Sequence, residues 1–162
     1  MSTPTLHVRP ATAADADTLA GFNIAMAAET EHRHLLPEVV GAGVRRLLAE
    51  PALGFYLVAE SAGAVVASAM VTTEWSDWRN GRFWWIQSVY VVPAHRRMGA
   101  FRALYRAIKD RAAAEGDVCG WRLYVEKDNG RAAATYRSLG MDGTDYRIME
   151  ELRPGLRWLR EG

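Results

Sequence analysis

Two adjacent arginines, Arg96 and Arg97, are followed closely by Gly99 at the point where an amphipathic stretch begins. The amphipathic pattern predicts a helix, and the first N–H groups of a helix, helped by its dipole, bind phosphate. Arginine side chains add charge-assisted hydrogen bonds, and a glycine lets a ligand approach the backbone closely. The same residues are also compatible with a solvated basic turn in which Gly99 serves only a tight bend.

The element before this turn is a run of aromatic and β-branched residues, 83–92. It has no run of charge on either face, which predicts a strand buried on both sides near the middle of a sheet. Pro93 lacks an N–H group and should end this strand. After the turn, basic residues take one side of the predicted helix and apolar residues the other. The apolar stripe is Phe101, Leu104, Tyr105, Ile108 and Ala112.

The whole run V-Y-V-V-P-A-H-R-R-M-G-A-F-R-A-L resembles the acetyl-coenzyme A signature of the GNAT-type N-acetyltransferases. That signature is Q/R-x-x-G-x-G/A after a strand that ends in Val-x-Pro. Arg96 occupies the Q/R position and Gly99 the first glycine, whereas Phe101 stands where the family has Gly or Ala. A bulky side chain at this last position must point away from a bound pyrophosphate.

The resemblance implies which residues contact acetyl-CoA. Backbone groups of the strand, those of Val89 and Val91 on either side of Tyr90, would hold the pantetheine amides and polarise the thioester carbonyl. The turn and the first helical residues would surround the pyrophosphate; these are Arg96, Arg97, Met98, Gly99, Ala100 and Phe101.

A second motif lies further along the chain. The run N-G-R-A-A-A-T-Y-R-S-L-G-M resembles the family pattern N-x-x-A-x-x-x-Y-x-x-x-G-F, with Asn129, Tyr136 and Gly140 in place and Met141 replacing Phe. From the residues alone, Tyr136 is compatible with an amphipathic core position and Asn129 with a turn or helix cap. The resemblance implies that Tyr136 protonates the departing thiolate and that Asn129 hydrogen-bonds the cofactor arm.

A general base is harder to find. An alkyl amine with a pKa of about 10.4 needs about 4.6 kcal/mol to lose its proton at pH 7, so a base or a water relay is expected. The predicted strand 83–92 contains no acid, only Gln87 and Ser88, and an amide cannot act as a base. The candidates are Glu29, Glu31, His32 and His34 on a predicted interhelix loop, with Glu74 and Glu126 at predicted strand ends. Glu31 and Glu74 rank first, although each acid is also compatible with a solvated surface charge.

Tryptophans are concentrated around the predicted third and fourth strands. Trp84 and Trp85 should face opposite ways and fill the two sides of the sheet. Trp75 and Trp78, with Gln87, are candidates for the acceptor-binding wall, because an aromatic face suits an apolar or cationic substrate. The alternative is that Trp75 and Trp78 only pack a long hairpin connection.

Composition restricts the class of protein. With 162 residues, 49% of them apolar, the chain suits one domain over residues 1–162. A formal net charge of +1 gives no reason to expect nucleic acid or an anionic membrane as a partner. The single cysteine, Cys119, excludes an internal disulfide and a cysteine-rich metal site. No signal peptide or membrane span is recognisable, so a cytoplasmic location is expected.

The other elements follow from periodicity and turn residues. We expect a strand over residues 6–9, a Thr12–Asp15 helix cap, and helices whose apolar faces contain Leu19 and Val44. The polar segment Glu29–Pro37 should be a loop between these helices. The remaining expected elements are a hairpin over residues 54–60 and 64–73, an Asn80-Gly81 turn, a strand over residues 121–125, a helix over residues 131–139 and a last strand over residues 146–152.

These observations predict an α+β (mixed α/β) domain with a central twisted mixed sheet flanked by helices. The resemblance implies a GNAT-like acyl-CoA N-acyltransferase fold whose fourth and fifth strands splay around the cofactor. The predicted activity is transfer of the acetyl group of acetyl-CoA to a primary amine of a small molecule or peptide, directly within a ternary complex and without metal. The alternatives are another acyl-CoA or acceptor, or a CoA-binding regulatory domain without turnover. Exposed apolar residues near the C-terminus could support a homodimer.

Overall fold

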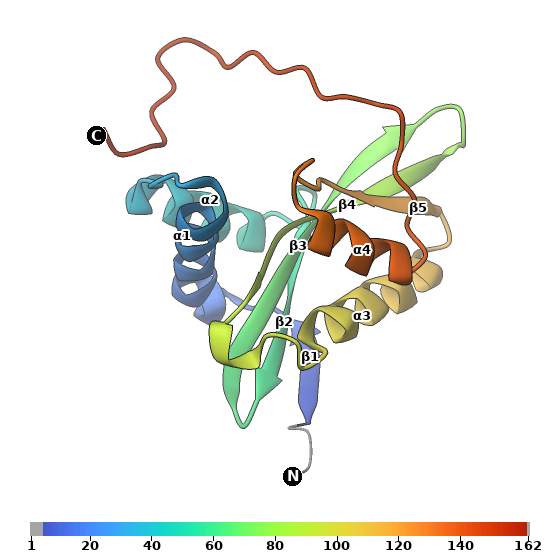
Figure 1. Cartoon of the computed structure of the whole chain (residues 1–162), viewed down its shortest axis with the longest axis horizontal. Coiled ribbons are helices and arrows are strands. Elements are labelled where there is room, and N and C mark those ends of the chain that lie inside the picture. The colour runs from blue at the N-terminus through green and yellow to red at the C-terminus, as the bar shows by residue number, and fades with distance from the viewer. Residues whose placement is uncertain (1–4, 162) are drawn as a thin grey trace. The chain divides into compact units, whose positions relative to one another are not determined.

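The computed structural model describes residues 5–161, and its strands form one five-stranded sheet (Figure 1). Neighbours along the sheet are also neighbours in sequence, and β1 to β4 pair antiparallel. The strands are β1 (Leu6–Pro10), β2 (Phe55–Ser61), β3 (Ala64–Ser76), β4 (Gly81–Val91) and β5 (Val118–Leu123).

The fifth strand makes the sheet mixed. A side chain added at Gly81 would meet Cys119, and one added at Gly120 would meet the ring of Phe83. The contacts therefore advance in the same direction along both strands, so β5 runs parallel to β4, as predicted from the helix between them. β5 begins and ends earlier than the predicted strand 121–125.

Contacts between Cα atoms divide the chain into two units, which are described separately. The first contains the described residues up to Arg122, together with Trp158 and the residues after it; the second is Leu123–Arg157. The prediction of one domain over residues 1–162 stays a prediction.

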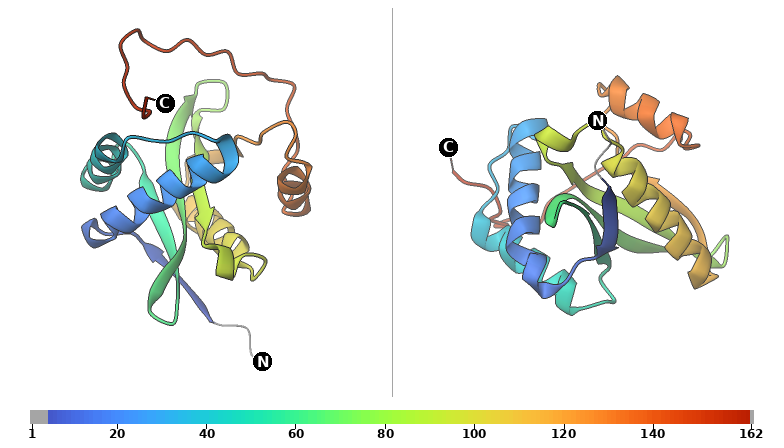
Figure 2. Two further views of the ribbon diagram at one scale, coloured as in Figure 1. Left: turned by 60° about the vertical axis from the view of Figure 1, so that its left-hand side comes forward. Right: turned by 90° about the horizontal axis from the view of Figure 1, so that it is seen from below.

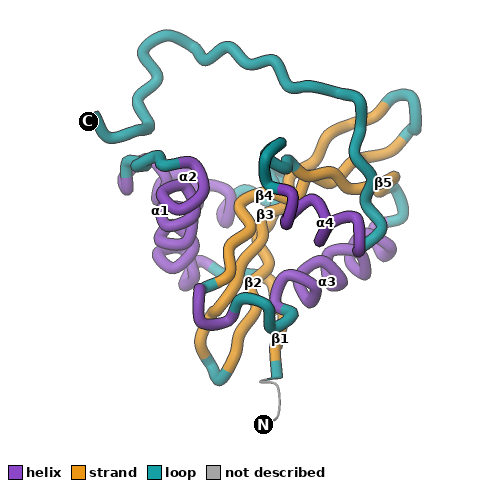
Figure 3. The backbone as a smooth tube through the Cα atoms, in the orientation of Figure 1, coloured by secondary structure: helices purple, strands orange, loops and turns teal. Residues whose placement is uncertain are grey.

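The β3–β4 hairpin turns at the predicted dipeptide. Ser76 pairs with Gly81, and Asn80 has a φ of 46°, a left-handed conformation that asparagine tolerates better than most residues. The predicted meander of β2, β3 and β4 is therefore confirmed (Figure 3).

The two helices α1 (Ala16–Glu31) and α2 (Pro37–Ala49) bury their apolar residues against one face of the sheet. Leu19 is fully buried there beside Val44 and Tyr56. Helix α1 continues through Glu29 to Glu31, so the predicted loop is shorter than expected: it begins only at His32, which is left-handed with a φ of 53°.

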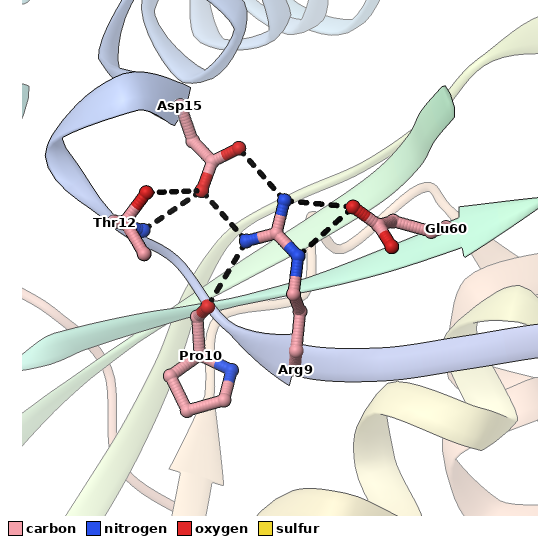
Figure 4. A network of polar contacts seen from close by, with 5 residues as sticks. All are labelled: Arg9, Pro10, Thr12, Asp15 and Glu60. Carbon is pink, nitrogen blue, oxygen red and sulfur yellow. Dashed lines mark hydrogen bonds and ion pairs between the residues drawn. The ribbon is translucent and has the colours of Figure 1, made fainter. Parts of the chain in front are cut away.

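Arg9 ties the start of α1 to the sheet (Figure 4). Its guanidinium donates to both carboxylate oxygens of Asp15, at 2.8 and 3.0 Å, and to Glu60 of β2 at 2.9 Å. Asp15 also accepts from the backbone N–H of Thr12 at 2.7 Å, as the predicted helix cap requires. The Arg9 guanidinium, with Thr12, holds the pKa of Asp15 below its ordinary value.

Helix α3 (Ala100–Glu115) covers the opposite face of the sheet from α1, as the view from below shows (Figure 2). Leu104 and Ile108 of the predicted apolar stripe are fully buried. Arg111 of α3 lies 3.8 Å from the ring centroid of Phe55, and Trp84 meets Phe55 edge to face, with 5.1 Å between ring centroids.

The second unit contains the helix α4 (Gly130–Ser138), close to the predicted span. The predicted strand over residues 146–152 is wrong, because residues 141–157 contain neither helix nor strand (Figure 3). An alternating pattern expresses a local preference, but a strand also requires a neighbouring ladder of hydrogen bonds.

Candidate active site

The β4–α3 turn (residues 92–99) is where the sequence places the phosphate site. β4 ends at Val91, and a short 3-10 helix, Pro93–His95, leads away from the sheet. Gly99 precedes α3 with a φ of 84°, a conformation that favours glycine. A side chain added there would meet nothing within 4 Å, so the start of α3 borders open space. The N–H groups of its first turn have no intrahelical acceptor and can receive an anion.

The two arginines of this turn differ in their contacts. Arg96 donates from Nε to the carbonyl of Val91 at 2.9 Å and from Nη2 to Glu29 at 2.6 Å, with its guanidinium 5.6 Å from the ring centroid of Tyr90. Arg97 is exposed, has a φ of 63°, and makes no hydrogen bond or ion pair with the described residues. Arg96 therefore fixes the turn to α1, and Arg97 is available to a ligand.

Glu29, one of the candidate general bases, is the α1 residue that binds Arg96. The Tyr90 hydroxyl donates to its second oxygen at 3.2 Å. Arg96, and then Tyr90, lower the pKa of Glu29 from its ordinary value. A carboxylate stabilised in its ionised form is a weak base, so the geometry favours a structural role for Glu29.

The other candidate bases lie on several elements. Glu31 ends α1 and is exposed, 3.7 Å from Arg33, while His32 and His34 are exposed after it. Glu74 lies in β3 and accepts from Arg122 at 2.7 Å. Glu126, in the second unit, accepts from the backbone of Asp128.

The end of β4 directs backbone groups away from its antiparallel neighbour. The N–H of Val92 donates to Val66 of β3 at 2.9 Å. Backbone groups alternate between the two edges of a strand, so those of Val91, and of Val89 two residues earlier, point to the other edge. These are the groups that the sequence resemblance assigns to pantetheine.

A polar cluster beside this part of β4 was not predicted. Asn23 of α1 donates from Nδ2 to the hydroxyl of Tyr56 at 3.1 Å, and the side chain of Ser88 lies beside the same hydroxyl. Burial raises the pKa of Tyr56 above 10.0. The three residues come from α1, β2 and β4, and no local sequence pattern connects them.

The β3–β4 hairpin tip (residues 74–82) carries the candidate acceptor residues. Trp75 and Trp78 are 60% and 83% exposed, so neither is needed to fill the core. Gln87, further along β4, donates to the Thr72 hydroxyl at 2.8 Å. Among the described residues, no hydrogen bond joins Gln87 to either tryptophan.

The second motif lies in the other unit. Asn129 caps α4, because its side-chain oxygen accepts from the N–H of Ala132 at 3.1 Å, which confirms its interpretation as a helix cap. Burial raises the pKa of Tyr136 above 10.0, so its phenol stays protonated at neutral pH.

Two further observations concern the described residues. Among residues 5–161, no group of three or more His, Cys, Asp or Glu side chains could hold a metal ion. No helix in the same range has the length and apolar character that a membrane span requires.

Comparison with protein families gives a match to the acetyltransferase (GNAT) family over residues 18–141. A crystal structure of a possible acetyltransferase from Clostridium difficile 630 shares 45% sequence identity, covers 91% of this chain and 97% of its own, and superposes with a TM-score of 0.85. A search among curated proteins gave no match.

Two more distant structures share the fold. A predicted acetyltransferase from Clostridium acetobutylicum with acetyl-CoA is 18% identical, with a TM-score of 0.76 and coverage of 91% of this chain and 96% of the other. AAC(6')-Iy in complex with the bisubstrate analogue CoA-S-monomethyl-acetylneamine is 13% identical, with a TM-score of 0.73 and coverage of 92% and 99%. The predicted mixed sheet flanked by helices is confirmed.

Proposed function

Since the chain belongs to the acetyltransferase (GNAT) family, we propose that it transfers the acetyl group of acetyl-CoA to a primary amine of a small molecule or peptide. Transfer is direct, within a ternary complex. The observation that carries this proposal is the β4–α3 turn, where left-handed Gly99 and exposed Arg97 border open space at the start of α3.

The residues present fit the cosubstrate. The pyrophosphate would lie against the backbone N–H groups from Arg96 to Phe101, with Arg97 supplying charge and Met98, Gly99 and Ala100 forming the wall. Val89 and Val91, on either side of Tyr90, would bind the pantetheine amides through the backbone groups on this edge, where the Val91 carbonyl also accepts from Arg96 at 2.9 Å. Structures of the same fold with acetyl-CoA or a CoA-linked analogue support this choice of cosubstrate.

Bound acetyl-CoA supplies an acetyl group activated as a thioester. The N–H of Val89 would polarise the acyl carbonyl, and Tyr136 would donate its proton to the departing thiolate. Because its pKa is raised, the phenol of Tyr136 stays protonated at neutral pH until the thiolate departs. Asn129 contacts the cofactor arm through its amide N–H groups, because its oxygen already caps α4.

The acceptor amine must lose a proton before it attacks. Glu31 and Glu74 remain the proposed bases, and Glu31 is the first to test because its arginine partner is further away. Trp75, Trp78 and Gln87 form the proposed acceptor wall. The family match extends from the first unit into the second, which supports the proposal that the whole chain acts as one domain.

Two measurements test the proposal. Calorimetry with acetyl-CoA should show binding, and a thiol-release assay over a panel of small amines, peptide N-termini and aminoglycosides should show turnover. Binding without thiol release on any amine would favour a CoA-binding regulatory domain. Faster release with a longer acyl-CoA, or with an alcohol, would favour another acyl group or acceptor.

A further inference from the structure

The strand β4 contains a bulge immediately before Val89. Ser68 of β3 pairs with Tyr90, but Met70 pairs with Gln87, so β4 has one residue more than β3 over this interval. Ser88 lies within the bulge and has a φ of 50°. Glycine adopts this conformation freely, whereas serine does so only where its surroundings hold it.

The contacts that hold Ser88 come from the buried core. Its hydroxyl lies beside that of Tyr56, where it lowers the pKa that burial raises, and Tyr56 accepts from Asn23 at 3.1 Å. Tyr56 and Asn23 are 3% and 6% exposed, and Tyr56 packs in the same cluster as Leu19 and Val44. Asn23 and Tyr56 are therefore fixed by the packing of α1 and α2, and Ser88, beside Tyr56, belongs to the bulge.

The stability of the core alone does not account for the polar cluster of Asn23, Tyr56 and Ser88. A phenylalanine at position 56 would fill the core without a hydroxyl to satisfy. Asn23 is also costly where it lies, because its Oδ1 is buried without a hydrogen-bond partner among the described residues. Buried polar groups of this kind are explained when they fix a backbone conformation that the protein uses.

We propose that Asn23 and Tyr56 are positioning residues that hold Ser88 left-handed and thereby aim the N–H of Val89 at the acyl carbonyl. The direction of this N–H depends on the peptide between Ser88 and Val89, so a change in the conformation of Ser88 redirects it. The inference rests on the proposed function, because only an acyl-CoA along β4 gives this N–H a reacting partner.

The first test compares Tyr56→Phe with Ser68→Ala. Ser68 is the matched control, since it is fully buried on β3 and its hydroxyl has no partner in the described structure. With acetyl-CoA and the panel amine that gives the fastest thiol release, Tyr56→Phe should lower kcat about tenfold and change KM for acetyl-CoA less than twofold. Ser68→Ala should change neither. A Tyr56→Phe enzyme with wild-type kcat would overturn the inference.

The second test separates the hydroxyl of Ser88 from its backbone conformation. Ser88→Ala loses the hydroxyl and disfavours a positive φ, whereas Ser88→Gly loses the hydroxyl but accepts a positive φ. Ser88→Gly should therefore retain more kcat than Ser88→Ala. Equal losses, or the reverse order, would contradict a role in holding the backbone.

A third measurement does not depend on turnover. Crystal structures of the ligand-free wild-type protein and of Tyr56→Phe should show Ser88 leaving the positive φ region in the variant. If φ stays positive, the positioning role is wrong even for an active enzyme. If the wild-type protein neither binds acetyl-CoA nor releases thiol, the proposed function fails, and the two crystal structures still decide whether Tyr56 holds Ser88.

Discussion

The β4–α3 turn and the β3–β4 hairpin tip lie at opposite ends of the same strand and are built differently. At the turn, Arg96 is bonded to Val91 and Glu29, and Gly99 has the conformation that the helix start requires. At the tip, Trp75 and Trp78 expose most of their surface. The turn is thus held by contacts within the protein, whereas the tip presents large, mostly exposed side chains.

This difference matches the proposed functions of the two regions: the turn binds the cosubstrate and the tip binds the acceptor. A cosubstrate common to a family needs the same preorganised contacts in every member, and preorganisation reduces the ordering cost of binding. An acceptor that differs between members is recognised by side chains that can change without disturbing the core. The following predictions test this contrast between the turn and the tip. The first concerns acetyl transfer itself, which requires both the cosubstrate and the acceptor.

Tyr136→Phe should lower kcat about 100-fold and leave the affinity for CoA within a factor of two, because only the proton donor is lost. Thiol release and calorimetry measure the two quantities. Burial raises the pKa of Tyr136 above 10.0, so this residue should not cause any loss of wild-type activity at lower pH. Tyr146→Phe, at an exposed tyrosine, is the control. Unchanged kcat in the Tyr136 variant would remove its role as an acid.

Arg97→Ala should raise the dissociation constant of CoA about tenfold, because a charge-assisted contact with phosphate is lost. The difference from wild type should shrink at high salt. Calorimetry at two ionic strengths measures both effects, with Arg106→Ala on the exposed side of α3 as the control. Wild-type affinity in the Arg97 variant would mean that the backbone alone binds the phosphates.

Glu29→Gln should raise KM for acetyl-CoA about threefold and leave kcat unchanged, because Glu29 acts through Arg96 on the turn. The pKa of Glu29 is held below its ordinary value, so Glu29 stays ionised as the pH falls and should not define the acid limb of the kcat profile. A parallel profile for Glu31→Gln tests the proposed base. If Glu29→Gln abolished the acid limb, Glu29 would be the base instead.

Trp78→Ala should have the smallest effect, raising KM for the acceptor about threefold by removing an aromatic face. Thermal stability and CoA affinity should not change, because this side chain is 83% exposed. Steady-state kinetics with the amine varied, together with a melting curve, measure these effects. A fall in the melting temperature would show that the tip supports the fold rather than the acceptor.

The turn was predictable because its residues are neighbours in sequence. Pro93, Gly99 and the apolar stripe of α3 each act locally, and their structure follows from local rules. The Asn80-Gly81 turn likewise determined the pairing of β3 with β4. The boundary of α1 was misplaced because polar residues such as Glu29 and Glu31 are good helix formers, and a polar segment need not be a loop.

The contacts around the site were not predictable because they join distant residues. Glu29 and Arg96 are 67 residues apart, and Asn23 and Tyr56 are 33 apart. Neither pair disturbs the local periodicity of its helix or strand. The nearest indication in the sequence was a missing acid: the predicted strand 83–92 contained only Gln87 and Ser88 where a general base was expected. In the structure, Ser88 lies in the bulge.

The hydrogen bonds of Arg9 also make the attachment of β1 to the start of α1 sensitive to acid. Asp15 has a folded-state pKa below its unfolded value of about 3.8, so the network contributes its full stability above that pH and loses it as the pH falls further. Protonated Asp15 would release Arg9, which joins the edge strand β1 to the start of α1. Amide hydrogen exchange below pH 4 should therefore show β1 detaching before the central strands open.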